Sequence, residues 1–284
     1  MSATNTPVAA GPDTIVLVHG LWMTPRSWEH WIAYYSDRGY QVLVPGYPGF
    51  EVEVEALRAD PVFIADLTVP TVLEHLESVI GGVERPPIII GHSFGGVLVQ
   101  ILLDRGYGAA GVAINSVPAE NVTLTPPSQI KALFPALRNP ANRNKLAQFT
   151  PAEFHYAFTN TLSDEESAKV YERYYIPAPG RFVWDGALAK LAPGRQQTYV
   201  NFRNDDRSPL LFIAGGKDNI MPASVNESNA RHYSHSRAVT DYYVFPERTH
   251  YTVGENGWEA VADYALDWAV RHAKPAPAKV SATA

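Results

Sequence analysis

With 284 residues, the chain is long enough to form one large α/β domain or two small ones. Its formal net charge of −6 argues against a nucleic-acid partner, because nucleic-acid binding requires a basic face. The absence of cysteine excludes disulfide bonds and thiol catalysis, and a hydrophobic fraction of 46% is ample for a buried core.

The two ends of the chain are expected to be disordered. Residues 1–13 are rich in Ala, Thr, Pro and Gly, and residues 273–284 are rich in Ala, Pro and Lys. The N-terminal residues have neither the basic start nor the apolar stretch of a signal peptide, and no segment approaches the length of a membrane span. We therefore expect a cytoplasmic protein with no membrane partner.

Buried strands and amphipathic helices alternate through the first part of the chain. The hydrophobic pattern predicts strands at 14–18, 40–45, 88–90 and 110–115, with helices at 24–39, 71–80 and 97–103. The first helix begins with Thr24 and Pro25, a favourable cap and first turn, and then presents an apolar face made of Trp28, Trp31, Ile32 and Tyr35. The acidic segment 51–70 is expected to be irregular. This alternation is typical of a parallel sheet with helices on both faces.

A glycine-rich turn links the strand at 88–90 to the helix that follows it. The turn reads Gly91-His92-Ser93-Phe94-Gly95-Gly96 and contains the pattern G-x-S-x-G. In a nucleophile elbow, this pattern holds a serine on a strained strand-to-helix corner with its Oγ exposed, and small flanking residues avoid collisions. A serine that merely caps the helix is the alternative. The buried strand before the turn and the helix after it favour Ser93 as a nucleophile.

The alternation stops between residues 121 and 206. This segment contains no predicted buried strand, and its helical patches are rich in aromatic residues. Ser163-Asp164-Glu165-Glu166 has the form of a capping box and predicts the start of one helix. We expect residues 121–206 to form a helical cap over the carboxyl edge of the sheet, inserted between core segments 14–120 and 207–272. Most of its aromatic side chains should pack in the cap's own core, and a minority should line a pocket.

Two polar residues follow the last two predicted strands. Strands are predicted at 209–214 and 242–245, and helices at 222–232 and after residue 256. Asp218 lies in a Gly-rich turn beyond the first strand, and His250 lies beyond the second. A serine becomes nucleophilic when an imidazole oriented by a carboxylate accepts its proton, and the chain order Ser-Asp-His fits this scaffold. We therefore predict Ser93 as the nucleophile, His250 as the base and Asp218 as its partner.

The first buried strand ends at His19-Gly20, where an oxyanion donor is needed. The backbone N–H groups of Leu21 and Phe94 are the expected donors. The rings of His19 and His92 are expected to be structural rather than to act as further bases.

The remaining histidines give no metal site. The pair His232-x-x-His235 has no third ligand at a useful spacing, so a solvated helix face is the better interpretation. His155 could touch a substrate, although a packed or solvated histidine is the more ordinary reading.

Taken together, these motifs resemble the α/β-hydrolase superfamily over residues 14–272. The motifs concerned are His19-Gly20, the elbow at Gly91 to Gly96, Gly216-x-Asp218 and Thr249-His250. The resemblance implies a mostly parallel sheet of eight strands and a serine hydrolase of the ester or lactone type that needs no cofactor. The chain departs from the pattern in the loop 44–49, which lacks the Asp of many relatives. Branches that attack with aspartate, the dehalogenases and epoxide hydrolases, are disfavoured because the elbow holds serine.

The expected function is cleavage of carboxylic esters or lactones with small-to-medium apolar groups through an acyl-enzyme. We expect the substrate to contact Trp22, Phe154, Phe158 and Tyr175. The same catalytic residues would also serve a cofactor-free perhydrolase of the haloperoxidase type or a carbon–carbon bond hydrolase. A different class of function is a receptor-like homologue that binds a ligand and turns it over slowly. The sequence carries no prediction of the oligomeric state.

Overall fold

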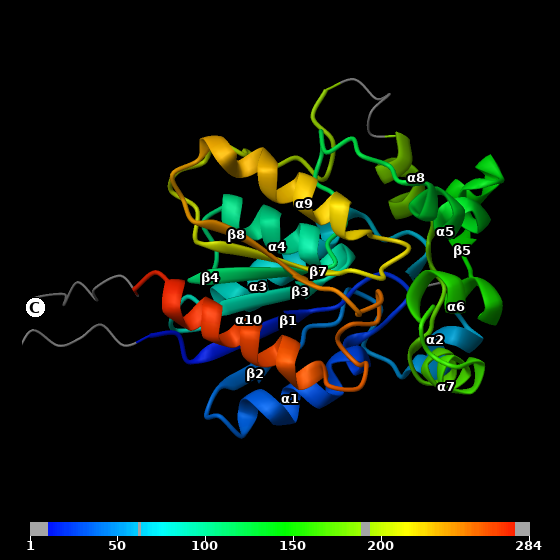
Figure 1. Cartoon of the computed structure of the whole chain (residues 1–284), viewed down its shortest axis with the longest axis horizontal. Coiled ribbons are helices and arrows are strands. Elements are labelled where there is room, and N and C mark those ends of the chain that lie inside the picture. The colour runs from blue at the N-terminus through cyan, green and yellow to red at the C-terminus, as the bar shows by residue number, and fades with distance from the viewer. Residues whose placement is uncertain (1–10, 62–63, 189–193, 276–284) are drawn as a thin grey trace, which may run out of the picture.

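The computed structural model describes residues 11–61, 64–188 and 194–275. Its centre is a six-stranded sheet in the order β2-β1-β3-β4-β7-β8, in which every neighbouring pair of strands is parallel (Figure 1). The strands are β1 (Thr14–Val18), β2 (Gln41–Leu43), β3 (Ile88–His92), β4 (Ala110–Ile114), β7 (Leu210–Gly215) and β8 (Thr240–Phe245). The expected disordered ends of the chain lie mostly outside the described residues.

The strand number corrects the eight strands implied by the family resemblance. Among the described residues before β3, β1 and β2 are the only strands. The two further strands that the described residues contain, β5 (Leu146–Ala147) and β6 (Ala178–Pro179), pair with each other as a separate antiparallel ribbon. These short strands also lie within the segment 121–206, where no buried strand was expected.

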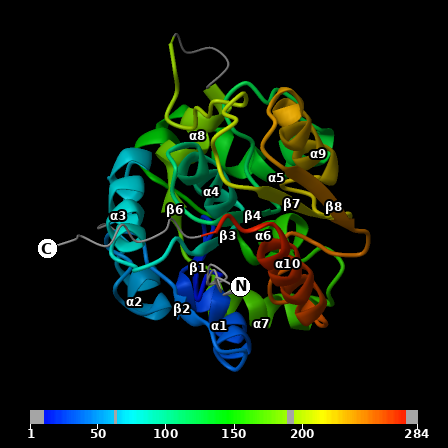
Figure 2. The same ribbon diagram turned by 90° about the vertical axis from the view of Figure 1, so that its left-hand side faces the viewer.

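Helices cover both faces of the sheet, as the alternating pattern predicts, and Figure 2 separates the two layers. One layer consists of the 3-10 helix η1 (Pro25–Trp28), α1 (Glu29–Ser36) and α10 (Trp258–His272). The other consists of α3 (Val69–Gly81), α4 (Phe94–Asp104), α9 (Ala223–His232) and the short η4 (Tyr233–His235). Because both faces are covered, β1, β3, β4 and β7 are buried along their whole length.

Two local expectations are corrected by packing. The segment 51–70 contains a short helix, α2 (Val54–Ala59), because Val54 and Leu57 lie on one face and are both buried. In α1, Trp31 and Tyr35 are fully buried, whereas Ile32 is 36% exposed and does not belong to the buried face.

The helices of the inserted segment, which spans residues 121–206, lie beyond the carboxyl ends of the strands (Figure 1). Its elements are α5 (Pro127–Leu137), the 3-10 helix η3 (Pro140–Asn144), β5, α6 (Pro151–Phe158), α7 (Asp164–Tyr174), β6 and α8 (Gly180–Leu188). The predicted capping box is confirmed, since Ser163 and Glu166 exchange both hydrogen bonds at the start of α7. None of the helices in the described ranges is long and apolar enough to cross a membrane.

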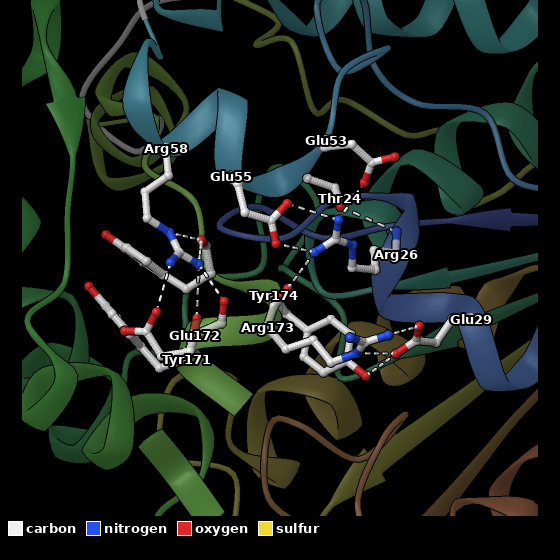
Figure 3. Close-up of polar contacts among 11 residues, drawn as sticks. Thr24, Arg26, Glu29, Glu53, Glu55, Arg58, Tyr171, Glu172, Arg173 and Tyr174 are labelled. Atoms are coloured by element: carbon white, nitrogen blue, oxygen red, sulfur yellow. Dashed lines mark hydrogen bonds and ion pairs between the residues drawn. The ribbon is translucent and has the colours of Figure 1, made fainter. Parts of the chain in front are cut away.

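Charged side chains connect the end of α7 to the core of the molecule (Figure 3). Arg173 forms a bidentate ion pair with Glu29 of α1, in which Nε lies 2.6 Å from Oε1. The Tyr174 hydroxyl donates a hydrogen bond to the same carboxylate at 2.5 Å. Arg58 of α2 bonds the Glu172 carboxylate at 3.0 Å and also donates to backbone carbonyls at the end of α7, including that of Tyr175 at 3.0 Å. We call this set the α7 contact.

Candidate active site

Ser93 occupies a strained corner between β3 and α4. Its backbone has φ 55° and ψ −116°, a conformation that non-glycine residues rarely adopt, and its side chain is almost fully buried. The flanking glycines are required by space: a Cβ at Gly91 would lie 2.2 Å from the Gly95 carbonyl oxygen, and one at Gly95 would lie 2.2 Å from that of Val18. This geometry is typical of a nucleophile elbow.

His250 and Asp218 lie in the loops that follow β8 and β7, and their side chains form a buried hydrogen bond. The distance from His250 Nδ1 to Asp218 Oδ2 is 2.6 Å. The other carboxylate oxygen, Oδ1, accepts the backbone N–H groups of Ile220 and Met221 at 2.9 and 2.7 Å. These bonds fix the carboxylate, which in turn fixes the imidazole with a proton on Nδ1. His250 Nε2 is buried and has no hydrogen-bond partner within the described part of the chain, so it is available as a proton acceptor.

His92 links the loop of His250 to the elbow of Ser93. Burial holds the pKa of His92 well below its usual value, so its ring is neutral at pH 7. Its Nε2 lies 2.8 Å from the His250 carbonyl oxygen, to which it donates its single N–H. The residue before the serine therefore holds the backbone of the histidine, a structural role consistent with the expectation from sequence.

Asn115, at the end of β4, is a supporting residue that the sequence analysis passed over. Its side chain is fully buried, donates from Nδ2 to the Thr249 carbonyl at 3.0 Å, and accepts the Gly215 N–H at 2.6 Å. It thereby joins the ends of β4 and β7 to the loop of His250. The available signal was a polar residue directly after a fully buried strand.

The backbone of Leu21 and Phe94 borders the same site. Phe94 is the first residue of α4, so its N–H group has no partner within the helix, and the N–H group of Leu21 lies in the turn after β1. Neither group donates a hydrogen bond within the described ranges. Both residues line a cavity together with Ser93. This arrangement leaves two donors free next to the serine.

The cavity next to Ser93 has a volume of about 510 Å³ and is walled by the core loops and by α5 and α8. Trp22, Ser93, Leu21 and Phe94 lie in its wall. Apolar side chains form much of the remaining wall, among them Ile130, Leu133, Phe134, Leu137, Phe182 and Val183.

Three of the four residues expected to contact substrate do not lie in this wall. Phe154 and Phe158 are fully buried and stacked with ring centroids 4.7 Å apart, and Tyr175 stacks on Tyr171 at 4.4 Å. The Tyr175 hydroxyl accepts the Phe149 N–H at 2.7 Å. These rings form the core between α6 and α7, which is where most cap aromatics were expected. The rings of Phe158 and His250 are nearly perpendicular, with their centroids 4.8 Å apart. Phe158 therefore contacts the predicted base and does not line the cavity.

The sequence analysis missed the contribution of α5. Its cavity-lining residues Ile130, Leu133, Phe134 and Leu137 recur at intervals of three and four, a helical stripe that is visible in the sequence. The prediction considered only aromatic residues of this segment, and the other three members of the stripe, Ile130, Leu133 and Leu137, are aliphatic.

His19 and His232 have structural surroundings. Burial lowers the pKa of His19 to about 4, and its Nδ1 lies 2.9 Å from the Gly20 carbonyl oxygen. His232 Nδ1 bonds the Ser228 carbonyl at 2.7 Å. Across the described residues, no group of three or more His, Cys, Asp or Glu side chains could hold a metal ion.

Comparison with known proteins gives a consistent result. A sequence model of the alpha/beta hydrolase family matches residues 15–264. Epoxide hydrolase A from Mycobacterium tuberculosis is 31% identical over 122 residues, which are 42% of this chain and only 36% of that protein.

Two solved structures resemble the whole fold. The monoacylglycerol lipase of Paleococcus ferrophilus has a TM-score of 0.61 and 18% identity, covering 93% of this chain and 97% of that one. The second structure is an extracellular alpha/beta-hydrolase from a Paenibacillus species, which is described as sharing structural and functional homology with tobacco salicylic acid binding protein 2. It has a TM-score of 0.65 and 19% identity, covering 92% of this chain and 100% of that one. At these identities the likeness concerns the fold.

Proposed function

The chain belongs to the alpha/beta hydrolase family, and from this premise we propose that it is a carboxylic ester hydrolase. Its substrates are esters or lactones with small-to-medium apolar groups. The observation that carries the proposal is the buried pair of His250 and Asp218, 2.6 Å apart, with Nε2 unpaired and the backbone of His250 held by the residue that precedes Ser93.

In the proposed reaction, the Ser93 Oγ attacks the ester carbonyl carbon while His250 Nε2 accepts the hydroxyl proton. The N–H groups of Leu21 and Phe94 stabilise the oxygen that becomes negatively charged. The carbon–oxygen bond to the alcohol then breaks, and the alcohol leaves with the proton from His250. Water, activated by the same imidazole, hydrolyses the acyl-enzyme and releases the carboxylic acid. Asp218 keeps the imidazole oriented and stabilises its positive charge.

The character of the cavity supports an apolar substrate. Aliphatic and aromatic side chains dominate its wall, and a volume of about 510 Å³ falls in the range of small-molecule sites. An apolar wall also excludes water from the oxyanion, which strengthens the hydrogen bonds to it.

We do not propose epoxide hydrolysis for this chain, although one relative is named an epoxide hydrolase. Epoxide hydrolases attack with aspartate and form an ester with it, whereas the elbow of this chain carries a serine. The region of similarity also spans only 36% of that relative. Ester cleavage fits the serine better.

A direct test combines active-site labelling with turnover. A fluorophosphonate probe should label Ser93, and p-nitrophenyl esters of increasing acyl length should be hydrolysed over many cycles. Ser93→Ala should abolish labelling and lower turnover by about 10⁴- to 10⁶-fold, and Asp218→Asn should lower it by about 10⁴-fold. Ser224→Ala, at an exposed position of α9, is the matched control and should behave as wild type.

Two results would contradict the proposal. Equal labelling of the wild type and Ser93→Ala would place the nucleophile elsewhere. A single stoichiometric burst without further product release would indicate a receptor-like ligand-binding protein instead of an enzyme.

A further inference from the structure

Among the polar residues that line the cavity, only Ser93 and Gln129 are buried, and the others are partly or fully exposed. Gln129 lies in the first turn of α5, is 5% exposed, and lines the cavity together with Ser93. One turn further along the same helix, Leu133 continues the wall with an aliphatic side chain.

The hydrogen bonds of Gln129 are incomplete. Its one side-chain hydrogen bond in the described structure runs from Nε2 to the Met221 sulfur at 3.4 Å, and a thioether is a weak acceptor. An amide can donate two hydrogen bonds and accept two, and buried polar groups in proteins are nearly always paired. Gln129 Oε1 makes no hydrogen bond with the described residues and, unlike the fully buried unpaired atoms, it keeps contact with solvent.

A second buried glutamine shows what a purely structural amide looks like in the same molecule. Gln100, in α4, is fully buried and is bonded at both ends of its amide. Its Nε2 donates to the Ser116 hydroxyl at 3.0 Å, and its Oε1 accepts the Tyr233 hydroxyl at 3.1 Å. Gln100 does not line the cavity. The difference shows that Gln129 faces the open space of the cavity.

Gln129 is linked to the candidate catalytic residues through Met221. The residue that it contacts, Met221, lines the cavity and donates its backbone N–H to Asp218 at 2.7 Å. The apolar residues Ile130 and Phe134 of the same helix are instead 55% and 59% exposed, so they border the outer part of the cavity. The amide is therefore buried on the inner side of α5.

A bound substrate displaces water from the surroundings of this amide. Loss of water without a replacement partner weakens binding, whereas a ligand ketone that accepts from the second Nε2 N–H, or a ligand hydroxyl that donates to Oε1, restores a hydrogen bond. A site built to hydrogen-bond an oxygen discriminates against analogues that lack it.

We propose that Gln129 is a specificity-determining residue that binds an oxygen of the substrate other than those of the scissile ester. The preferred substrates are then carboxylic esters or lactones whose otherwise apolar portion carries a ketone or hydroxyl group. This inference rests on the proposed function.

The test compares esters that differ only in one ketone. The p-nitrophenyl esters of 4-oxopentanoate and 5-oxohexanoate are paired with those of pentanoate and hexanoate, and kcat/KM is measured for each. For at least one pair the wild type should prefer the oxo ester, and Gln129→Met should lower that preference about tenfold. Leu133→Met changes the wall without changing its polarity, and Gln100→Met removes a structural amide. Neither control should alter the ratio of oxo to plain ester, whatever its effect on each rate or on stability.

A binding measurement keeps this inference separable from the proposed reaction. The Kd values of methyl 5-oxohexanoate and methyl hexanoate are measured by calorimetry on Ser93→Ala and on Ser93→Ala/Gln129→Met. Preference for the oxo ester that disappears with Gln129→Met supports the role of Gln129 even if no ester is turned over and Ser93 is not labelled. The inference is overturned if the wild type prefers neither oxo ester, or if Gln129→Met leaves the ratios unchanged while esters are hydrolysed normally.

Discussion

The two halves of the inserted segment differ in what their side chains contact. In α6 and α7, aromatic rings such as Phe154 pack in a closed core, and the α7 contact ties the end of the helix to α1 and α2. In α5 and α8, apolar side chains border the cavity, and Phe134 remains 59% exposed. The α6–α7 half holds the segment in place, and the half made of α5 and α8 provides the surface that a ligand meets. The following predictions use this division, beginning with the largest expected effect on stability.

Phe154→Ala should lower the free energy of unfolding by about 3–5 kcal/mol, because it opens a cavity in a fully packed ring stack. Its profile of activity against acyl chain length should match the wild type, because the ring does not line the cavity. Urea unfolding and a series of p-nitrophenyl esters measure the two quantities. A changed profile in a variant of unchanged stability would reverse the assignment of the two halves.

Arg58→Met should lower the free energy of unfolding by about 1–2 kcal/mol. The guanidinium donates to carbonyl oxygens at the end of α7, where a positive charge also stabilises the helix dipole. Glu172→Gln removes only the exposed ion pair with Arg58 and should cost at most about 0.5 kcal/mol. Equal losses for both variants would mean that the ion pair, and not the carbonyl contacts, holds α7.

Glu29→Gln should cost under about 1 kcal/mol at pH 7, because the carboxylate is partly exposed. The hydrogen bonds from Arg173 and Tyr174 lower the pKa of Glu29 in the folded protein. A lowered pKa stabilises the fold above the ordinary value of the carboxyl group, and this stabilisation is lost as the pH falls through the folded value. The stability difference between wild type and Glu29→Gln should therefore shrink on acidification.

Hydrogen exchange separates this effect from a general loss of surface charge. Glu29→Gln should speed amide exchange in α7, since it loosens the α7 contact. Glu77→Gln removes an ion pair between α3 and Arg105, which directly follows α4. Neither partner contacts α7, so exchange in α7 should stay unchanged. Equal exchange rates in the two variants would contradict a role for Glu29 in holding α7.

Phe134→Ser should change the free energy of unfolding by no more than about 0.5 kcal/mol, because the ring is largely exposed. Its effect should appear in function, as a shift of the acyl-length optimum toward shorter chains. The chain-length profile is compared with that of Val270→Ser, which alters an exposed apolar residue of α10 outside the cavity wall. A shift in both variants would point to a general surface effect.

Much of the fold was predictable because strong local signals agreed with the tertiary structure. The buried strands around Ile89 and Leu211 are continuous apolar runs, and the capping box at Ser163 fixes a helix start within a few residues. The expected number of eight strands came from the family resemblance and not from residues in the chain. The hydrophobic pattern itself marks six strands, which is the number in the main sheet.

The candidate site was only partly predictable. Ser93, Asp218 and His250 each follow a recognisable strand, so their common edge follows from a parallel sheet. The cavity wall depends on which face of each inserted helix turns inward, and this is decided by packing between distant segments. Aromatic side chains were expected there, yet the large rings of Phe154 and Tyr175 are more stabilising in a closed core. Nothing in the sequence around Gln129 indicates that its side chain is buried beside the cavity.

The inserted segment leaves the sheet after β4 and returns at β7, two strands that lie next to each other in register. Because these strands are parallel, the segment leaves at the carboxyl edge of the sheet and returns at the amino edge, so both attachment points belong to one rigid frame. The entropy of closing such a loop rises only with the logarithm of its length, by about 0.6 kcal/mol for each doubling. Lineages can therefore lengthen, shorten or exchange the segment without disturbing the register of the sheet, and substrate preference can diverge while the catalytic edge stays fixed.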